Sequence, residues 1–162
     1  MPRRPSPERQ AEYQELKLFL LTLYEFFDRW AEAQPQKPPF AMLPLLRQSI
    51  ETAEMQTFSA ALRGMRMAVN ESLEMTIHFD QETVRQADDF LVRKGCKTLT
   101  WMRNEAGQTF CEILRRGRIR NDEEYHLMVL RLNAASETAL QGADREMAAR
   151  MVAAYECGRS VR

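Results

Sequence analysis

Proline is missing from most of the chain. All seven prolines lie within the first 44 of the 162 residues, and Pro44 is the last of them. Proline breaks a helix interior because it lacks the amide N–H and clashes with the preceding turn. Only six glycines interrupt the rest of the chain, and β-branched residues are few there. The sequence therefore predicts an all-α fold.

Cysteine is scarce and neither sign of charge prevails. The three cysteines, Cys96, Cys111 and Cys157, form no Cys-x-x-Cys pair, which is typical of free thiols in a reducing compartment. The 23 basic and 23 acidic residues cancel, so the chain as a whole has no net attraction for nucleic acid or an anionic membrane. We therefore expect a cytoplasmic protein with no membrane partner.

Long apolar runs are also lacking. The uncharged run from Leu18 to Tyr24 is far shorter than the ~20 apolar residues that a membrane span needs. Arg3 and Arg4 precede this run, as basic residues do in a secretory leader, but three acidic residues lie between: Glu8, Glu12 and Glu15. We therefore expect neither a membrane span nor a cleaved leader here.

Residues 8–33 are predicted to form the first helix, after a disordered tail at 1–7. Apolar residues repeat at spacings of three and four along one face, which comprises Tyr13, Leu16, Leu20, Leu23, Phe27 and Trp30. Other apolar side chains make the middle of this helix apolar nearly all round, which is typical of a central, buried helix. In so small a chain we expect another copy to cover the excess, at an interface formed by Leu18, Phe19, Leu21, Tyr24 and Phe26.

Prolines, caps and glycines predict the next elements. A Pro-rich linker at 34–39 ends the first helix, and Pro44 suits the first turn of a second helix that runs to about Met75. Asp80 is the predicted N-cap of a third helix, which ends before Gly95.

The stretch at 98–116 fits two structures. A helical stripe is formed by Leu99, Met102, Ala106, Phe110 and Ile113. A small hairpin at 98–114, with its turn at 104–107, is the alternative, because threonines and aromatic residues suit strands. We favour the helix, since a lone hairpin is only marginally stable.

The clearest local signal follows Gly117. Asn121 suits an N-cap, and Glu124 three residues later completes a capping box. After Gly142, apolar residues mark a last helix that ends at Gly158, before a short tail at 159–162. Together these patterns predict about six helices in a bundle-like single domain at 8–158.

Basic residues are concentrated in one segment. Residues 93–120 contain eight basic and two acidic residues, whereas 48–92 contain eight acidic and three basic ones. Four arginines surround Gly117: Arg115, Arg116, Arg118 and Arg120. Guanidinium groups fork onto phosphate oxygens, so we hypothesise that this turn binds a polyanion, with helix ends adding donors. Alternatively, the basic segment pairs with the acidic one, within the fold or across a dimer, or offsets a helix dipole.

Metal ligands and catalytic motifs give weaker signals. Glu123 and His126 have the Glu-x-x-His spacing of di-iron bundles, and Glu74 lies four residues before His78. The full pattern needs two such pairs and two further glutamates, and the chain has only two histidines. The sequence contains no nucleophile motif and no Gly-rich phosphate loop. We therefore expect no metal and no cofactor, and we favour a non-enzymatic role.

The favoured interpretation is a helical protein-protein interaction module that self-associates through its first helix or binds another protein there. Methionines of the predicted second helix add adaptable apolar surface: Met42, Met55, Met65, Met67 and Met75. The alternative interpretation is a helical protein that binds phosphate or nucleic acid through the turn at 115–120.

Overall fold

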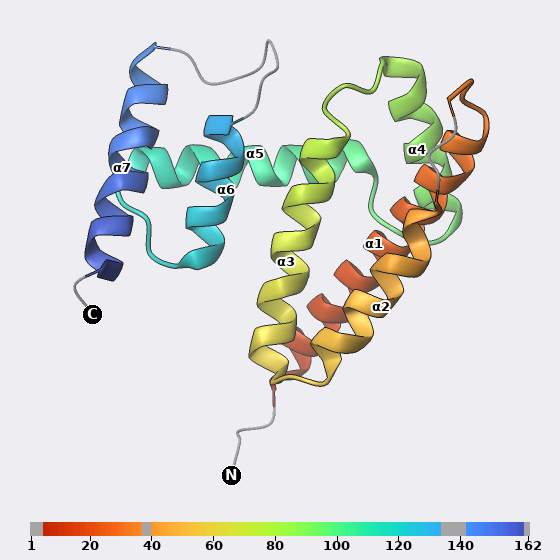
Figure 1. Ribbon diagram of the computed structural model, residues 1–162, viewed down its shortest axis with the longest axis horizontal. Coiled ribbons are helices and arrows are strands. Elements are labelled where there is room, and N and C mark those ends of the chain that lie inside the picture. Colours follow the sequence, from red (N-terminus) through yellow and green to blue (C-terminus); the bar gives the residue numbers. More distant parts are fainter. Residues whose placement is uncertain (1–4, 37–39, 134–141, 161–162) are drawn as a thin grey trace. The chain divides into compact units, whose positions relative to one another are not determined.

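The computed structural model describes residues 5–36, 40–133 and 142–160, and within these ranges it contains α-helices and no strand (Figure 1). The helices are α1 (Pro7–Glu32), α2 (Met42–Glu54), α3 (Phe58–Met75), α4 (Gln81–Arg93), α5 (Leu99–Arg116), α6 (Asp122–Asn133) and α7 (Gly142–Ser160). The predicted all-α fold is confirmed. The stretch at 98–116 is helical, so the hairpin alternative is wrong. None of these helices is both long enough and apolar enough to cross a bilayer.

Contacts divide the chain into two compact units. The first comprises Met1–Val69 and Phe79–Thr100, and the second comprises Asn70–His78 and Trp101–Arg162. The boundaries fall within α3 and near the start of α5. Each unit is described separately below. Part of the predicted N-terminal tail, part of the Pro-rich linker and the last two residues lie outside the described ranges.

In the first unit, α1 is the helix around which the others pack. Both α2 and α4 contact it, and Phe58 at the start of α3 lies 5.7 Å from Tyr13 between ring centroids. The buried apolar side chains of α1 are Tyr13, Phe19, Leu20, Leu23, Phe26 and Phe27. This arrangement satisfies a helix that is apolar on nearly every side, because each side meets a different neighbour.

This packing changes what the five residues of the predicted oligomer interface present to solvent. Phe19 and Phe26 are only 2% and 7% exposed, because helices of the same chain cover them. Leu21 and Tyr24 are half-buried. Leu18 alone among the five is an exposed large apolar side chain, at 46%. Self-association stays a prediction, with a much smaller apolar surface to support it.

Ion pairs join α1 to each neighbour in the first unit. Glu12 accepts two hydrogen bonds from the Arg66 guanidinium on α3, at 2.7 and 2.9 Å. Lys17 lies 2.6 Å from Glu54 on α2, and Glu15 lies 2.6 Å from Lys97, beyond α4. Partly exposed pairs such as these contribute at most about 1 kcal/mol each. These ion pairs therefore affect the orientation of each helix against α1 more than the free energy of unfolding of the unit.

The predicted second helix at 44–75 is wrong as a single element. The structure has a break at 55–57, where Gln56 N–H bonds back to the Ala53 carbonyl and the Thr57 hydroxyl accepts from Ala60 N–H at 3.3 Å. The break lets Ile50 on α2 and Leu62 on α3 both lie buried in the first unit. A threonine before an apolar run is a common N-cap, so Thr57 was the available sequence signal.

The start of α2 is capped from a distance. Its own N-cap residue, Ala41, offers no side-chain acceptor. Instead the Asp28 carboxylate of α1 accepts from Met42 N–H at 2.7 Å and from Leu43 N–H at 3.0 Å. A carboxylate at a helix N-terminus both satisfies unpaired donors and offsets the helix dipole. One side chain therefore fixes where α2 begins against α1.

Other predicted helix ends are confirmed. Asp80 caps α4 by accepting from Thr83 N–H at 2.7 Å, and Gly95 follows that helix with φ +76°. Gly117 follows α5 with φ +74°, a conformation that side chains other than glycine's rarely adopt. Helix α7 begins at Gly142 as expected but extends past the predicted end at Gly158 to Ser160.

The second unit has its own core. Buried side chains of α5, α6 and α7 form one cluster that consists of Phe110, Ile113, Leu127, Met128, Ala148 and Met151. Ile119, in the turn between α5 and α6, packs against this cluster. The core thus holds the two ends of the α5–α6 turn in place.

Replacing Asp28 with alanine should lower the free energy of unfolding by about 1–2 kcal/mol, because two N–H donors of α2 lose their acceptor. Asp28→Asn retains one acceptor oxygen and should lose less. Asp89→Ala, on the exposed side of α4, is the control and should change stability by less than about 0.5 kcal/mol. Urea denaturation followed by circular dichroism measures all three. Equal losses for Asp28→Ala and Asp89→Ala would contradict the long-range cap.

Candidate functional site

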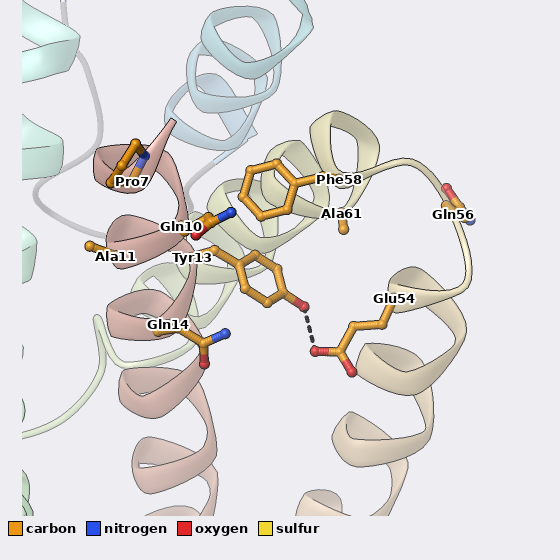
Figure 2. Close-up of a pocket in the computed structure, with 9 residues that line it drawn as sticks. All are labelled: Pro7, Gln10, Ala11, Tyr13, Gln14, Glu54, Gln56, Phe58 and Ala61. Carbon is orange, nitrogen blue, oxygen red and sulfur yellow. Dashed lines mark hydrogen bonds between the residues drawn. The ribbon is translucent and has the colours of Figure 1, made fainter. Parts of the chain in front are cut away.

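A hollow in the first unit lies between the first turns of α1 and the connection from α2 to α3 (Figure 2). It has a volume of about 630 Å³ and includes Tyr13, Glu54 and Phe58 in its lining. Figure 2 shows the Tyr13 hydroxyl directed at Glu54, to which it donates a hydrogen bond of 3.0 Å. Sequence periodicity could not reveal this hollow, because its lining comes from positions about 40 residues apart in the chain.

The two ionisable side chains in the lining of this hollow, Tyr13 and Glu54, already bind one another. Lys17 Nζ donates to the same Glu54 oxygen at 2.6 Å. The hydrogen bonds from Lys17 and Tyr13 hold the pKa of the Glu54 carboxyl below its usual value. Burial, with help from Glu54, raises the pKa of Tyr13 from 10.0 to about 12. Near neutral pH Tyr13 is therefore the donor and Glu54 the acceptor of a hydrogen bond that joins α1 to α2.

The predicted arginine site lies in the second unit, at the turn from α5 to α6. Arg115 and Arg120 line a shallow hollow of about 420 Å³ together with Arg116 and Glu112. The backbone reverses at Gly117, whose N–H bonds to the carbonyls of Ile113 and Leu114. The arginines that the sequence predicts as a site therefore lie at one turn of the structure.

Arg116 differs from its neighbours. Its guanidinium forms an ion pair with Glu124 on α6 and donates two further hydrogen bonds to the Arg118 carbonyl, at 3.2 and 3.1 Å. The side chains of Arg116 and Glu124 are 23% and 17% exposed. Arg116 therefore fastens the end of α5 to the start of α6, and its charge is already matched inside the unit.

The other three arginines remain exposed. Arg115, Arg118 and Arg120 form no ion pair with any residue in the described ranges. The alternative, pairing with the acidic segment 48–92, fails for the part of that segment in the same unit. There Glu71 pairs with His126 at 3.0 Å and Glu74 pairs with Arg131 at 3.3 Å.

The helix ends at this turn offer an anion fewer hydrogen-bond donors than the sequence predicts. Asn121 caps α6 by accepting from Glu124 N–H at 2.9 Å, which confirms that half of the predicted capping box. The Glu124 carboxylate accepts from Arg120 N–H at 2.8 Å, one residue before the N-cap. The first turn of α6 is acidic, and the last turn of α5 presents carbonyl groups. An anion at this turn would therefore depend on guanidinium groups and gain little from the backbone.

The predicted metal pair does not come together with further ligands. His126 Nε2 lies 3.0 Å from Glu71 Oε1, so its ring contacts α3. Glu74 pairs with Arg131 instead of sharing a site with His78. The described part of the chain holds no group of three or more histidine, cysteine, aspartate or glutamate residues placed to bind a metal.

The cysteines are free thiols in the structure. Cys111 and Cys157 are exposed, and Cys96 is half-buried with its Sγ 3.5 Å from the Thr22 hydroxyl oxygen. Within the first unit Cys96 therefore packs against α1, which matches the ordinary role of a small apolar residue.

Tyr13 should titrate abnormally late in alkali. The folded chain keeps the Tyr13 proton up to about pH 12, whereas the unfolded chain loses it near pH 10. The resulting stability is present below pH 10 and is lost as the pH rises toward 12, because the unfolded state then binds fewer protons. Absorbance of tyrosinate, compared between the wild type and Tyr13→Phe, measures this pKa. A difference spectrum that titrates near pH 10 would contradict the burial of Tyr13 and its bond to Glu54.

Comparison with known proteins adds no family to this geometry. No protein-family model, no curated protein and no solved structure matches the chain.

Proposed function

We propose that this protein binds phosphate groups of an anionic ligand, nucleic acid in particular, through Arg115, Arg118 and Arg120. The proposal is supported by a difference in the surroundings of four neighbouring arginines. One of them, Arg116, is matched by Glu124, while the other three are exposed and have no carboxylate partner in the described ranges. Unmatched guanidinium groups gathered on one turn are an electrostatic footprint for phosphate.

The Arg116–Glu124 pair supports this function indirectly. Together with the Gly117 reversal and Ile119, it holds the turn in one conformation. A preorganised turn loses less conformational entropy when a ligand binds, so more of the electrostatic attraction appears as affinity. Arg116 is in this sense a positioning residue, and the exposed arginines are the binding residues.

The zero net charge of the chain is compatible with this proposal. Attraction to phosphate is screened beyond roughly 8 Å at physiological ionic strength, so a local cluster matters more than the total charge. The segment at 93–120 has an excess of six basic residues over acidic ones, from eight basic and two acidic. The expected affinity is that of non-specific binding, with dissociation constants of about 10⁻⁴–10⁻⁶ M at physiological salt.

Replacing the three exposed arginines with glutamine should abolish binding of phosphate-bearing ligands and leave stability unchanged. Binding is measured at low salt by fluorescence anisotropy with labelled duplex DNA, labelled single-stranded RNA and a labelled ATP analogue. A control with the same loss of charge changes three other exposed arginines to glutamine, namely Arg47, Arg145 and Arg150. That control should keep at least half of the affinity, because its arginines lie on other helices.

Arg116→Gln provides the opposite control. It should lower the free energy of unfolding by about 1–3 kcal/mol, because Glu124 loses a charged hydrogen-bond partner. The triple variant should not lower it. If no phosphate-bearing ligand binds the wild type at low salt, or if the triple variant unfolds like Arg116→Gln, the proposal is wrong and the three arginines are structural.

Self-association through α1 is a second candidate, and the exposure of Leu18 favours it. This leucine is 46% exposed beside the half-buried Leu21, on a helix whose other large apolar side chains are buried or half-buried. Exposed apolar residues that lie together on one surface often mark an interface. Sedimentation at micromolar concentration should then show a dimer that Leu18→Glu dissociates. A wild type that sediments as a monomer at high concentration would contradict this candidate.

A further inference from the structure

The lining of the hollow at the α5–α6 turn includes no aromatic side chain on which a nucleobase or another ring could stack. Its lining consists of Glu112, Arg115, Arg116 and Arg120. Proteins that read bases in single strands stack them on aromatic side chains, which contribute about 1–3 kcal/mol per base. Of the guanidinium groups in the lining, that of Arg116 is held by Glu124 and the Arg118 carbonyl. The site can therefore recognise negative charge but offers no aromatic face for a base.

The same hollow is poorly suited to a compact phosphate. Sites that enclose one phosphate group use several backbone N–H donors, often at a helix N-terminus. Here the N–H groups of Arg120 and Glu124 are already bonded to side chains of the turn. Glu112 adds a carboxylate to the lining, which would repel an anion placed deep in the hollow. A ligand would therefore lie across the three exposed arginines, Arg115, Arg118 and Arg120. Each guanidinium would then contact a different phosphate.

We infer that the ligand of this turn is the phosphodiester backbone of a double-stranded nucleic acid, contacted at three phosphates and without selection for base sequence. The inference rests on the proposed function and names the ligand class for the same site. A duplex is favoured over a single strand because its phosphates have the higher charge density, and the turn has no stacking residue to compensate a single strand. One phosphate is assigned to each of Arg115, Arg118 and Arg120.

Salt dependence measures the number of phosphates. For duplex DNA the slope of log K against log salt concentration is about −0.9 per neutralised phosphate, so three contacts predict a slope near −2.7. Each single change, Arg115→Gln, Arg118→Gln or Arg120→Gln, should reduce the magnitude of the slope by about 0.9. The control variant with Arg47, Arg145 and Arg150 changed to glutamine should keep the wild-type slope.

The experiment titrates the full chain with two labelled DNA duplexes of equal length, one rich in A·T and one rich in G·C pairs. The two duplexes should bind within about threefold of each other, since each specific base contact would add about 1–3 kcal/mol of discrimination. Unlabelled ATP and inorganic phosphate, added at constant ionic strength, should displace neither duplex. A single strand of the same length should bind more weakly and with a shallower slope, near −0.7 per phosphate.

The outcomes separate this inference from the proposed function. If ATP or inorganic phosphate competes at constant ionic strength, if the duplexes differ more than tenfold, or if the slope is near −1, the ligand class is wrong. The arginine site then survives as a site for a compact or sequence-specific ligand. If no phosphate-bearing ligand binds the wild type, both the inference and the proposed function fail.

Discussion

The first unit depends on one constraint: the middle of α1 is apolar on nearly every side and must be enclosed. Helices α2, α3 and α4 of the same unit pack against it, and polar contacts also join α2 and α3 to α1. Glu12 binds Arg66 on α3, Lys17 binds Glu54 on α2, and the Asp28 carboxylate caps the start of α2. The hydrophobic effect drives the enclosure, because its free energy scales with the apolar area that is buried. The polar contacts select one arrangement of the helices among many.

The second unit shows how burial gives similar side chains different roles. Arg116 lies over the junction of α5 and α6, where Glu124 can reach it, and the pair closes the turn. The other three arginines of the turn face solvent, and no carboxylate in the described ranges forms an ion pair with them. Glu71 and Glu74, the acidic residues of the segment 48–92 that belong to this unit, bind His126 and Arg131 instead. The charge left over at the turn is what a phosphate-bearing ligand would use.

Local signals were sufficient for most of the helices. The absence of proline and the helical spacing of apolar residues predicted α1, α4, α5 and α7, because both act within one helix. N-caps and glycines are equally local signals. Asp80 and Asn121 cap helices as predicted, and Gly95 and Gly117 follow helices as predicted. The break at 55–57 was missed because no proline or glycine marks it, and Thr57 is only a weak signal.

For the candidate site, the sequence by itself determined the charge, the reversal at Gly117 and the grouping of four arginines, since these follow from residues that are adjacent in the chain. Only the tertiary structure decided which arginine is structural, because the partner of Arg116 comes from the next helix. It also decided that Phe19 and Phe26 belong to the core and that Asp28 caps a helix 14 residues away. Such contacts depend on which surfaces meet, and the apolar pattern of a single helix does not specify its neighbours.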